Sequence, residues 1–291
     1  MRKVGSTTDT ADANGEYTNG NVAQGIPPTI INAEMLNTFQ RELVNVVEGA
    51  GISLDPSNDS QVLEAVRKLL STGRLLNVKT FTTSGTYTPT PGTKSIIVEG
   101  VGGGGGAGGA PFTSSGYYTG TGGGGAGGYF KTRITNIPAT VLVTVGKGGG
   151  GGAGGEIGNN SNGGDGELTS FGSYAQASGG KGSTTTNTPE NTGLSYRFGS
   201  GFGGFATNGN IINSNGSAGT ASLILTVGSG LSGAGGASFF SAGGAPTPFN
   251  SPGSDGKAGA GGGGVVSMSN SSVVCKGGSG GDGLVIVYEY A

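Results

Sequence analysis

The sequence predicts a mixed fold in which a short helical part precedes β-strands that border a sandwich of packed polyglycine type II helices. Three observations predict it. Glycine supplies 68 of the 291 residues, far above its usual share of about 7%. Only 7 of these glycines lie in residues 1–78, so the composition changes sharply there. Beyond that point, runs rich in Val, Ile and Tyr repeatedly adjoin glycine runs, which is typical of folded strands and not of a linker.

Composition also excludes several classes of function. The 15 basic and 17 acidic residues give a net charge of -2 without a basic run, so we expect no nucleic-acid partner. Cys275 is the only cysteine and histidine is absent, which removes histidine-based catalysis and multi-cysteine zinc sites. We therefore expect no enzyme activity, no metal and no cofactor.

Targeting signals are not apparent in the sequence. It has no apolar stretch of about 18 residues and no basic start followed by an apolar run, so it predicts neither a membrane span nor a secretory signal. We expect a soluble chain made in the cytoplasm.

Three parts are predicted along the chain. Residues 1–28 are rich in Thr, Asp, Asn and Gly and end in Pro27-Pro28, so we expect an extended arm that orders against a partner. Residues 29–78 carry helical periodicity, and residues 79–291 form the glycine-rich part. The boundary is placed at residue 78 because charge density falls and glycine content rises there.

Two helices are predicted in residues 29–78. The first begins after Asn32 as its N-cap and ends at Gly49 or Gly51. Its apolar residues follow the spacing of one helix face: Ala33, Leu36, Phe39, Leu43 and Val46 or Val47. The second begins with a capping box over residues 58–61 and stops at Gly73, with an apolar side made of Leu63, Val66 and Leu70. Two arrangements could cover these helices: a hairpin packed on its own C-terminal part, or a collar in which helices from several chains meet. Because isolated short helices are marginal in water, we favour the collar.

Strands are predicted at four places, each bordering a glycine run: residues 95–101, 140–145, 223–227 and 284–290. The phrase VLVTVGKGGGGGAGG (141–155) also recurs as LILTVGSGLSGAGG (223–236) with one gap. A random linker would not repeat a junction between a strand and a glycine run.

The glycine runs themselves are predicted to fold. Ordering a residue costs about 1–2 kcal/mol of backbone entropy, so another interaction has to offset it. Helices of the polyproline type point their backbone N–H and C=O groups outward, and only glycine lets several of them pack closely enough to bond to one another. Six runs are candidates: 102–109, 122–128, 146–155, 233–236, 259–264 and 277–283. The alternative is a set of flexible linkers, which the strand junctions disfavour.

Five pieces of sequence follow one another in the N-terminal part: TADANGEYTNGN (10–21), GIPPT (25–29), NAEMLN (32–37), QRELVNVVE (40–48) and AGISLD (50–55). In this order they resemble the start of tailed-bacteriophage tail-fibre proteins. The family usually has an aromatic residue at the position of Met35.

The C-terminal part contains six further pieces of this kind: GGGGAGGYF (122–130), TVGKGGGGGAGG (144–155), LTSFG (168–172), GGASFFSAGGA (235–245), GAGGGG (259–264) and GGDGLVIVYEY (280–290). They resemble the glycine-rich domain found at the ends of tail fibres and in T-even-type fibre-tip adhesins. What the two resemblances imply is a homotrimeric fibre of the virion. Its N-terminal part would attach to phage tail or baseplate proteins, and its tip would bind a host cell-surface receptor, either an outer-membrane protein or a polysaccharide.

In fibre-tip adhesins the loops that join polyglycine helices contact the receptor, so the resemblance places binding in the irregular segments between glycine runs. Aromatic rings among Ser, Asn and Gly also supply contact area at low entropic cost. The candidate receptor-binding residues are Phe112, Tyr117, Tyr118, Tyr196, Phe198, Phe202, Phe205 and Phe249. The alternative for these rings is that they cover the edge of the glycine bundle. We expect Phe171, Phe239 and Phe240, in family-like pieces, to be buried.

Asp165 and Asp282 are predicted to be turn residues and not calcium ligands, since one carboxylate per turn is too few for that ion. The sequence thus favours a non-catalytic attachment protein. Three alternatives stay open: a fibre or baseplate connector whose tip is another protein, an ice-binding protein, and a glycan-cleaving fibre that uses scattered carboxylates such as Asp165, Glu167 and Glu190.

Overall fold

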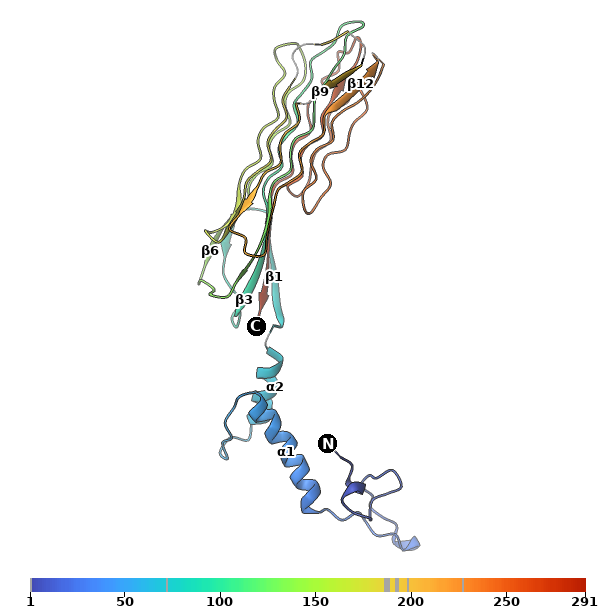
Figure 1. Ribbon diagram of the computed structural model, residues 1–291, viewed down its shortest axis with the longest axis vertical. Coiled ribbons are helices and arrows are strands. Elements are labelled where there is room, and N and C mark those ends of the chain that lie inside the picture. The colour runs from blue at the N-terminus through green and yellow to red at the C-terminus, as the bar shows by residue number, and fades with distance from the viewer. Residues whose placement is uncertain (1, 72, 186–188, 192–193, 198, 227) are drawn as a thin grey trace. The chain divides into compact units, whose positions relative to one another are not determined.

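The computed structural model describes residues 2–71, 73–185, 189–191, 194–197, 199–226 and 228–291 (Figure 1). The chain divides into two compact units, Met1–Arg74 and Leu75–Ala291. Residues 75–78, which composition groups with the helices, lie in the first strand of the second unit because the backbone becomes extended directly after Arg74.

The first part of unit 1 is a set of hydrogen-bonded turns in place of the expected extended arm. Short 3-10 helices occupy Val4–Ser6 (η1) and Val22–Gln24 (η2). The Gly5 N–H donates to the Gly15 carbonyl at 3.1 Å, and the Glu16 N–H donates to Asp12 Oδ1 at 2.7 Å. Because Asp, Asn and Thr side chains stabilise turns locally, this composition closes the segment on itself.

Two helices follow in unit 1. Helix α1 spans Ala33–Gly49, and its N-cap is Asn32 as predicted, since the Met35 N–H donates to Asn32 Oδ1 at 3.0 Å. Helix α2 spans Gln61–Ser71. The predicted capping box is wrong: Asn58 Oδ1 accepts from the Ser60 N–H at 2.8 Å, one residue before the helix, and the Gln61 side chain bonds back to the preceding loop.

The contact between α1 and α2 is small. Val47, Ala50 and Ala65 form its buried centre. A second set of apolar side chains on the same helices stays exposed: Leu36, Phe39, Leu43, Leu63, Val66 and Leu70. The hairpin therefore buries only part of the apolar stripe that the sequence provides.

One end of unit 2 is a β-sandwich of two five-stranded antiparallel sheets, which we call the base (Figure 1). The first sheet has the order β1 (Leu75–Phe81), β15 (Leu284–Tyr290), β3 (Ser95–Val101), β5 (Tyr129–Ile134) and β11 (Ile212–Ser214). The second has the order β10 (Ala206–Thr207), β8 (Ala175–Ala177), β7 (Thr169–Phe171), β6 (Val141–Thr144) and β2 (Gly85–Tyr87).

Alternate side chains of both sheets fill the core between them, among them Val98, Phe130, Val143, Phe171 and Val287. The strands predicted at 95–101 and 284–290 are confirmed at those bounds, and the one predicted at 140–145 is confirmed within a residue.

Long extended segments continue from the base strands and form a slab (Figure 1). Segment 102–110, which follows β3, shows how they bond. Its N–H groups donate in turn to three neighbours: Gly103 to Glu167 (3.0 Å), Gly104 to Gly281 (2.9 Å) and Gly105 to Gly125 (2.8 Å). Three residues on, Gly106 donates to Gly164 and Ala107 to Gly278. Its carbonyls accept from three further segments: Gly103 from Gly180, Gly104 from Gly149 and Gly105 from Gly262.

The central segments of the slab have no room for side chains larger than those present. A Cβ on Gly104 would lie 2.0 Å from the Ala260 carbonyl oxygen, and one on Gly124 would lie 2.1 Å from that of Gly105. Outer segments differ, since a Cβ on Gly150 would meet no atom within 4 Å. Outward positions there recur every third residue, as at Lys147, Gly150 and Ala153.

The opposite end of unit 2 carries short strands and loops (Figure 1). Strand β12 (Ser222–Thr226) lies between β9 (Ser195–Arg197) and β13 (Ser229–Leu231), and β4 (Thr119–Gly120) pairs with β14 (Val266–Ser267). The strand predicted at 223–227 thus corresponds to β12, with residue 227 outside the described part. Tyr118, Ile224, Val266 and Met268 form a small core beneath these strands.

Candidate binding surface at the tip

The end of unit 2 that carries β9 and β12 is called the tip here (Figure 1). It comprises residues 110–120, 155–160, 189–191, 194–197, 222–226, 228–232, 247–252 and 266–275. These segments connect the ends of the slab segments, so the slab determines where each of them emerges.

An apolar row crosses the three-stranded sheet of the tip. Leu223 of β12 is the register partner of Tyr196 on β9 and of Leu231 on β13. The three side chains are 36%, 52% and 55% exposed, and Leu225, two residues along β12, is also exposed on this face. Ile224, on the opposite face, is fully buried. Strand alternation therefore directs four large apolar side chains to the surface.

Six further large apolar side chains of the tip segments are exposed. They are Tyr117, Ile157, Leu194, Phe249, Val273 and Val274. Large apolar side chains gathered at one end of a molecule mark an interaction surface more often than scattered single ones do.

Hydrogen bonds hold the tip segments to one another. Tyr118 and Glu190 exchange backbone bonds of 2.9 and 2.8 Å, and the Asn250 N–H donates to the Val266 carbonyl at 2.7 Å. The Thr113 hydroxyl donates to the Met268 carbonyl.

Cys275 is buried beside Ala110, and burial raises the pKa of its thiol to about 11, so it is not a reactive thiolate at neutral pH.

The structure separates the eight candidate residues. Tyr117, Tyr196 and Phe249 are exposed at the tip, and Phe112 is partly buried there. Tyr118 is only 1% exposed, because its ring fills the small core beside Ile224; it does not present a contact surface. Phe198 lies outside the described residues.

Phe202 and Phe205 lie along the slab and not at the tip. They are 76% and 58% exposed on segment 199–205. The backbone of this segment accepts hydrogen bonds from that of the neighbouring segment 178–185.

Sequence reasoning missed the leucines of the tip sheet because it considered only aromatic residues. The run Leu223-Ile224-Leu225 was the available signal, because it makes both faces of one strand apolar. One face can pack on the core, so the other face has to be covered by something else. Nothing in the sequence indicated that β9 and β13 would flank β12, because that pairing depends on the slab.

The three phenylalanines expected in the interior have different surroundings. Phe171 is fully buried in the base, which confirms that prediction. Phe239 is 61% exposed, so its predicted burial is wrong. It lies stacked on the buried Tyr129, with ring centroids 3.8 Å apart. Phe240 is half-buried and contacts the rings of both Tyr129 and Phe239 in an edge arrangement, so its predicted burial is only partial.

The two aspartates predicted in turns lie instead in extended slab segments. Asp165 pairs with Lys181 at 2.7 Å, and Asp282 pairs with Lys147 at 2.9 Å. The Lys181 ammonium and the Gly182 N–H lower the pKa of Asp165. Each aspartate therefore joins neighbouring segments as an ionised partner. Within the described residues, no group of three or more acidic, Cys or His side chains is arranged to hold a metal ion.

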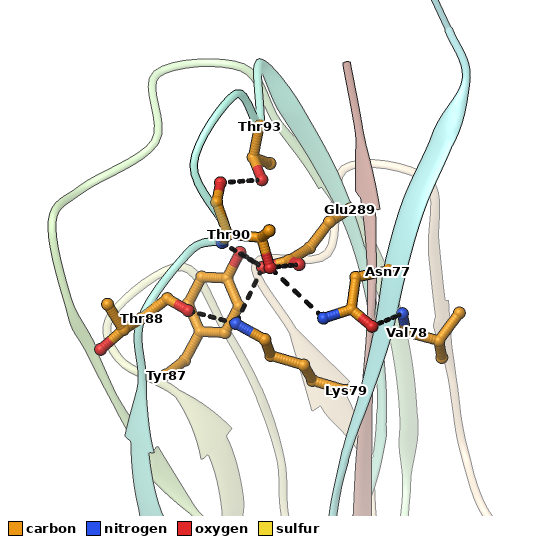
Figure 2. Close-up of polar contacts among 8 residues, drawn as sticks. All are labelled: Asn77, Val78, Lys79, Tyr87, Thr88, Thr90, Thr93 and Glu289. Atoms are coloured by element: carbon orange, nitrogen blue, oxygen red, sulfur yellow. Dashed lines mark hydrogen bonds and ion pairs between the residues drawn. The ribbon is translucent and has the colours of Figure 1, made fainter.

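A fully buried carboxylate, Glu289 on β15, lies at the base (Figure 2). It accepts from the Tyr87 hydroxyl at 2.8 Å and from the N–H and hydroxyl of Thr90 at 3.0 and 2.6 Å, while Lys79 Nζ is 3.3 Å away. Burial raises its pKa, but these donors together hold that pKa below its usual value. Its partners come from β1, β2 and the loop after β2, so the cluster fastens these segments to the C-terminal strand.

The fold and the tip together define a class: a β-sandwich extended by a hydrogen-bonded slab that carries short strands and loops at its far end. The chain belongs to the family of the glycine-rich domain, whose model matches residues 80–290. No curated protein matches it. Neither described helix combines the length and the hydropathy required to cross a membrane.

Proposed function

We propose that this protein is a bacteriophage tail-fibre protein that attaches the virion to the host surface through its tip. The observation that carries the proposal is the apolar row formed by Tyr196, Leu223 and Leu231 across three adjacent strands. Aromatic and aliphatic anchors at the centre of a surface, with a polar rim, are what a protein or glycan receptor can bury. The resemblance of residues 10–55 to tail-fibre N-termini supplies the viral context.

The slab serves this function as a rigid scaffold of polyglycine type II helices. Support comes from the hydrogen bonds of segment 102–110, which reach successive neighbours and return to the same one after three residues. That period belongs to helices of the polyproline type. None of the described glycines in 102–109 or 122–128 has a positive φ, which also fits this conformation. A rigid scaffold keeps the tip loops ordered before binding and so lowers the entropic cost of contact.

The helices of unit 1 are proposed to assemble the fibre as a homotrimer. Leu36, Phe39 and Leu43 on α1 follow the 3,4 spacing of a coiled-coil seam and remain exposed in the single chain. Copies of α1 can cover one another along this seam, and the turns of residues 1–28 then contact tail or baseplate proteins. Three tips on one fibre add avidity to a weak single contact.

We propose attachment without catalysis. Of the scattered carboxylates, Asp165 is committed to an ion pair and kept ionised, which is the opposite of the raised pKa that a general acid requires.

The test combines mass and cell binding. Light scattering should give the mass of a trimer, and the labelled trimer should bind saturably to some strains of a bacterial panel. Replacing Tyr196, Leu223 and Leu231 together by serine should reduce binding at least tenfold. Serine at exposed Leu142 on β6, far from the tip, is the matched control and should bind as the unaltered protein does. Circular dichroism confirms folding of each variant.

Two results would overturn this account. Unchanged cell binding by the triple variant would place attachment elsewhere on the molecule. A trimer that binds no strain, while another phage protein binds its tip, would favour the fibre connector.

A further inference from the structure

Two phenylalanine rings stand on one broad face of the slab, away from the tip. Phe202 and Phe205 belong to segment 199–205 and are among the most exposed large apolar side chains of the described residues. Two large exposed rings at adjacent outward positions form a contiguous apolar patch, and such patches mark interaction sites more often than single exposed side chains do.

The slab fixes where these rings lie. The Lys181 N–H donates to the Phe202 carbonyl and the Ser178 N–H to the Phe205 carbonyl, both at 2.8 Å. On the other side, segment 215–220 donates through Gly216 and Gly219. A Cβ on Gly201 would lie 1.9 Å from the Lys181 carbonyl oxygen. Within residues 201–205, a Cβ on any of the three glycines would collide with a backbone carbonyl oxygen, and the two outward positions both hold phenylalanine.

The spacing of the two rings follows from the segment. Residues three apart in a helix of the polyproline type are one turn apart, or about 9 Å at a rise of about 3.1 Å per residue. The backbone bonds on both sides hold the spacing of the two Cα atoms. The rings attached to them form two hydrophobic platforms about one turn apart, a separation comparable with that of alternate sugar rings along an extended glycan.

Polar groups border the platforms. Lys181, on the neighbouring segment 178–185, donates its backbone N–H to the Phe202 carbonyl. Its ammonium group forms an ion pair of 2.7 Å with Asp165 on segment 161–167. Ser178 flanks Phe205, and the exposed Thr184 follows Lys181 one turn along. These charged and hydroxyl groups can exchange hydrogen bonds with sugar hydroxyls, while the apolar faces of the sugars cover the rings.

Charge and area decide between possible occupants. The ion pair leaves this face without the positive charge that a nucleic acid or an acidic polysaccharide would need. Two rings offer at most about 500 Å² of aromatic surface, below the roughly 800 Å² per partner of a stable protein interface. A second copy of the chain is disfavoured for the same reason.

We propose that the Phe202–Phe205 face binds an extended, uncharged glycan that lies along the slab with alternate sugars stacked on the two rings. This site is separate from the tip and goes beyond the attachment role, since it holds whether or not the tip binds a receptor. In a fibre attached to a cell, this site would let the side of the slab bind polysaccharide of the cell surface.

The test is titration of the full-length protein with cellohexaose, chitohexaose and maltohexaose, followed by NMR or calorimetry. At least one hexasaccharide should bind at least tenfold more tightly than its own disaccharide, because only the longer chain reaches both rings. Phe202→Ala and Phe205→Ala should each lower its affinity at least fivefold. Leu142→Ala, which removes an equally exposed side chain from β6, is the control and should have no effect.

Failure of all three hexasaccharides to bind the folded protein would overturn the proposal, as would hexasaccharide binding that survives the double phenylalanine variant. The outcome is independent of attachment. A tip triple variant that loses cell binding but keeps the hexasaccharide affinity would separate the two sites, and loss of the glycan site alone would leave the tip account intact.

Discussion

The base and the slab of unit 2 are built from the same chain but have different kinds of interior. In the base, side chains such as Val98, Phe171 and Val287 fill the space between two sheets. In the slab, backbones approach until a Cβ on Gly104 would lie 2.0 Å from a carbonyl oxygen. Strand β3 passes from one into the other at Val101 without a break. The comparison teaches that a buried interior can rest on the absence of side chains as well as on their fit.

The two regions also differ in how they present residues to solvent. A strand exposes every second residue, whereas the outer slab segments expose every third, as at Lys147, Gly150 and Ala153. At an outward position such as Gly150 a Cβ would meet no neighbouring atom, so side chains there do not disturb the packing of the backbones. The proposed glycan site at Phe202 and the proposed tip surface both rely on such outward positions.

The largest effect is expected in the base. Phe171→Ala removes a fully buried ring that contacts Tyr87, with centroids 5.4 Å apart. We expect the free energy of unfolding to fall by about 3–5 kcal/mol, which denaturant titration measures. A loss under about 1 kcal/mol would mean that the slab, and not the base core, dominates stability.

The second-largest effect on stability is expected from adding a single methyl group inside the slab. Gly104→Ala should destabilise by about 3 kcal/mol, because the methyl group collides with a backbone that cannot move without displacing its segment. Gly150→Ala is the matched control, and it should be neutral or stabilising by about 0.4–1 kcal/mol, since it meets no neighbour and restricts the unfolded chain. Equal effects at the two positions would contradict close packing of the slab.

The buried carboxylate of the base links stability to pH. The pKa of Glu289 is lower in the folded chain than its usual value of 4.5, so the folded state is favoured above that value and loses this contribution as the pH falls through the folded pKa. Glu289→Gln should cost about 1.5 kcal/mol at pH 7. It should also flatten the acid dependence of the melting temperature. Glu156→Gln, at an exposed position, is the control and should leave both unchanged.

The smallest effect is expected on the outer slab. Lys147→Ala breaks the exposed ion pair with Asp282, and we expect a change of less than about 1 kcal/mol, seen as little or no shift in the melting temperature. A much larger loss would show that ionic contacts between segments, and not their backbone bonds, hold the slab together.

Much of the framework could be predicted from the sequence, because local signals determine it. Asn32 as a helix cap and the strands at residues 95–101 and 284–290 depend on residues close in the chain. Slab segments such as 161–167 and 199–205 were not predicted, because they are not continuous glycine runs. Glycine is needed only at their inward positions, and their outward positions hold residues such as Asp165 and Phe202. Glycine spaced by two or three residues was the available signal.

The candidate site was harder to predict. Tyr118 and Tyr117 are adjacent and chemically alike, yet one is buried and the other exposed, because β4 pairs with a strand more than 140 residues away. Phe239 stays 61% exposed although it stacks on Tyr129 and meets Phe240 edge-on. Such outcomes depend on long-range pairing that no local pattern records.

The central claim, that the glycine runs are a folded scaffold and not linkers, is tested most directly by hydrogen exchange of their backbone amides. The amides of Gly103 to Gly106 and Gly123 to Gly125 donate to neighbouring segments, so they should exchange as slowly as amides of β3 and β15 in the base. Exchange at the rate of an unstructured glycine chain would contradict the account.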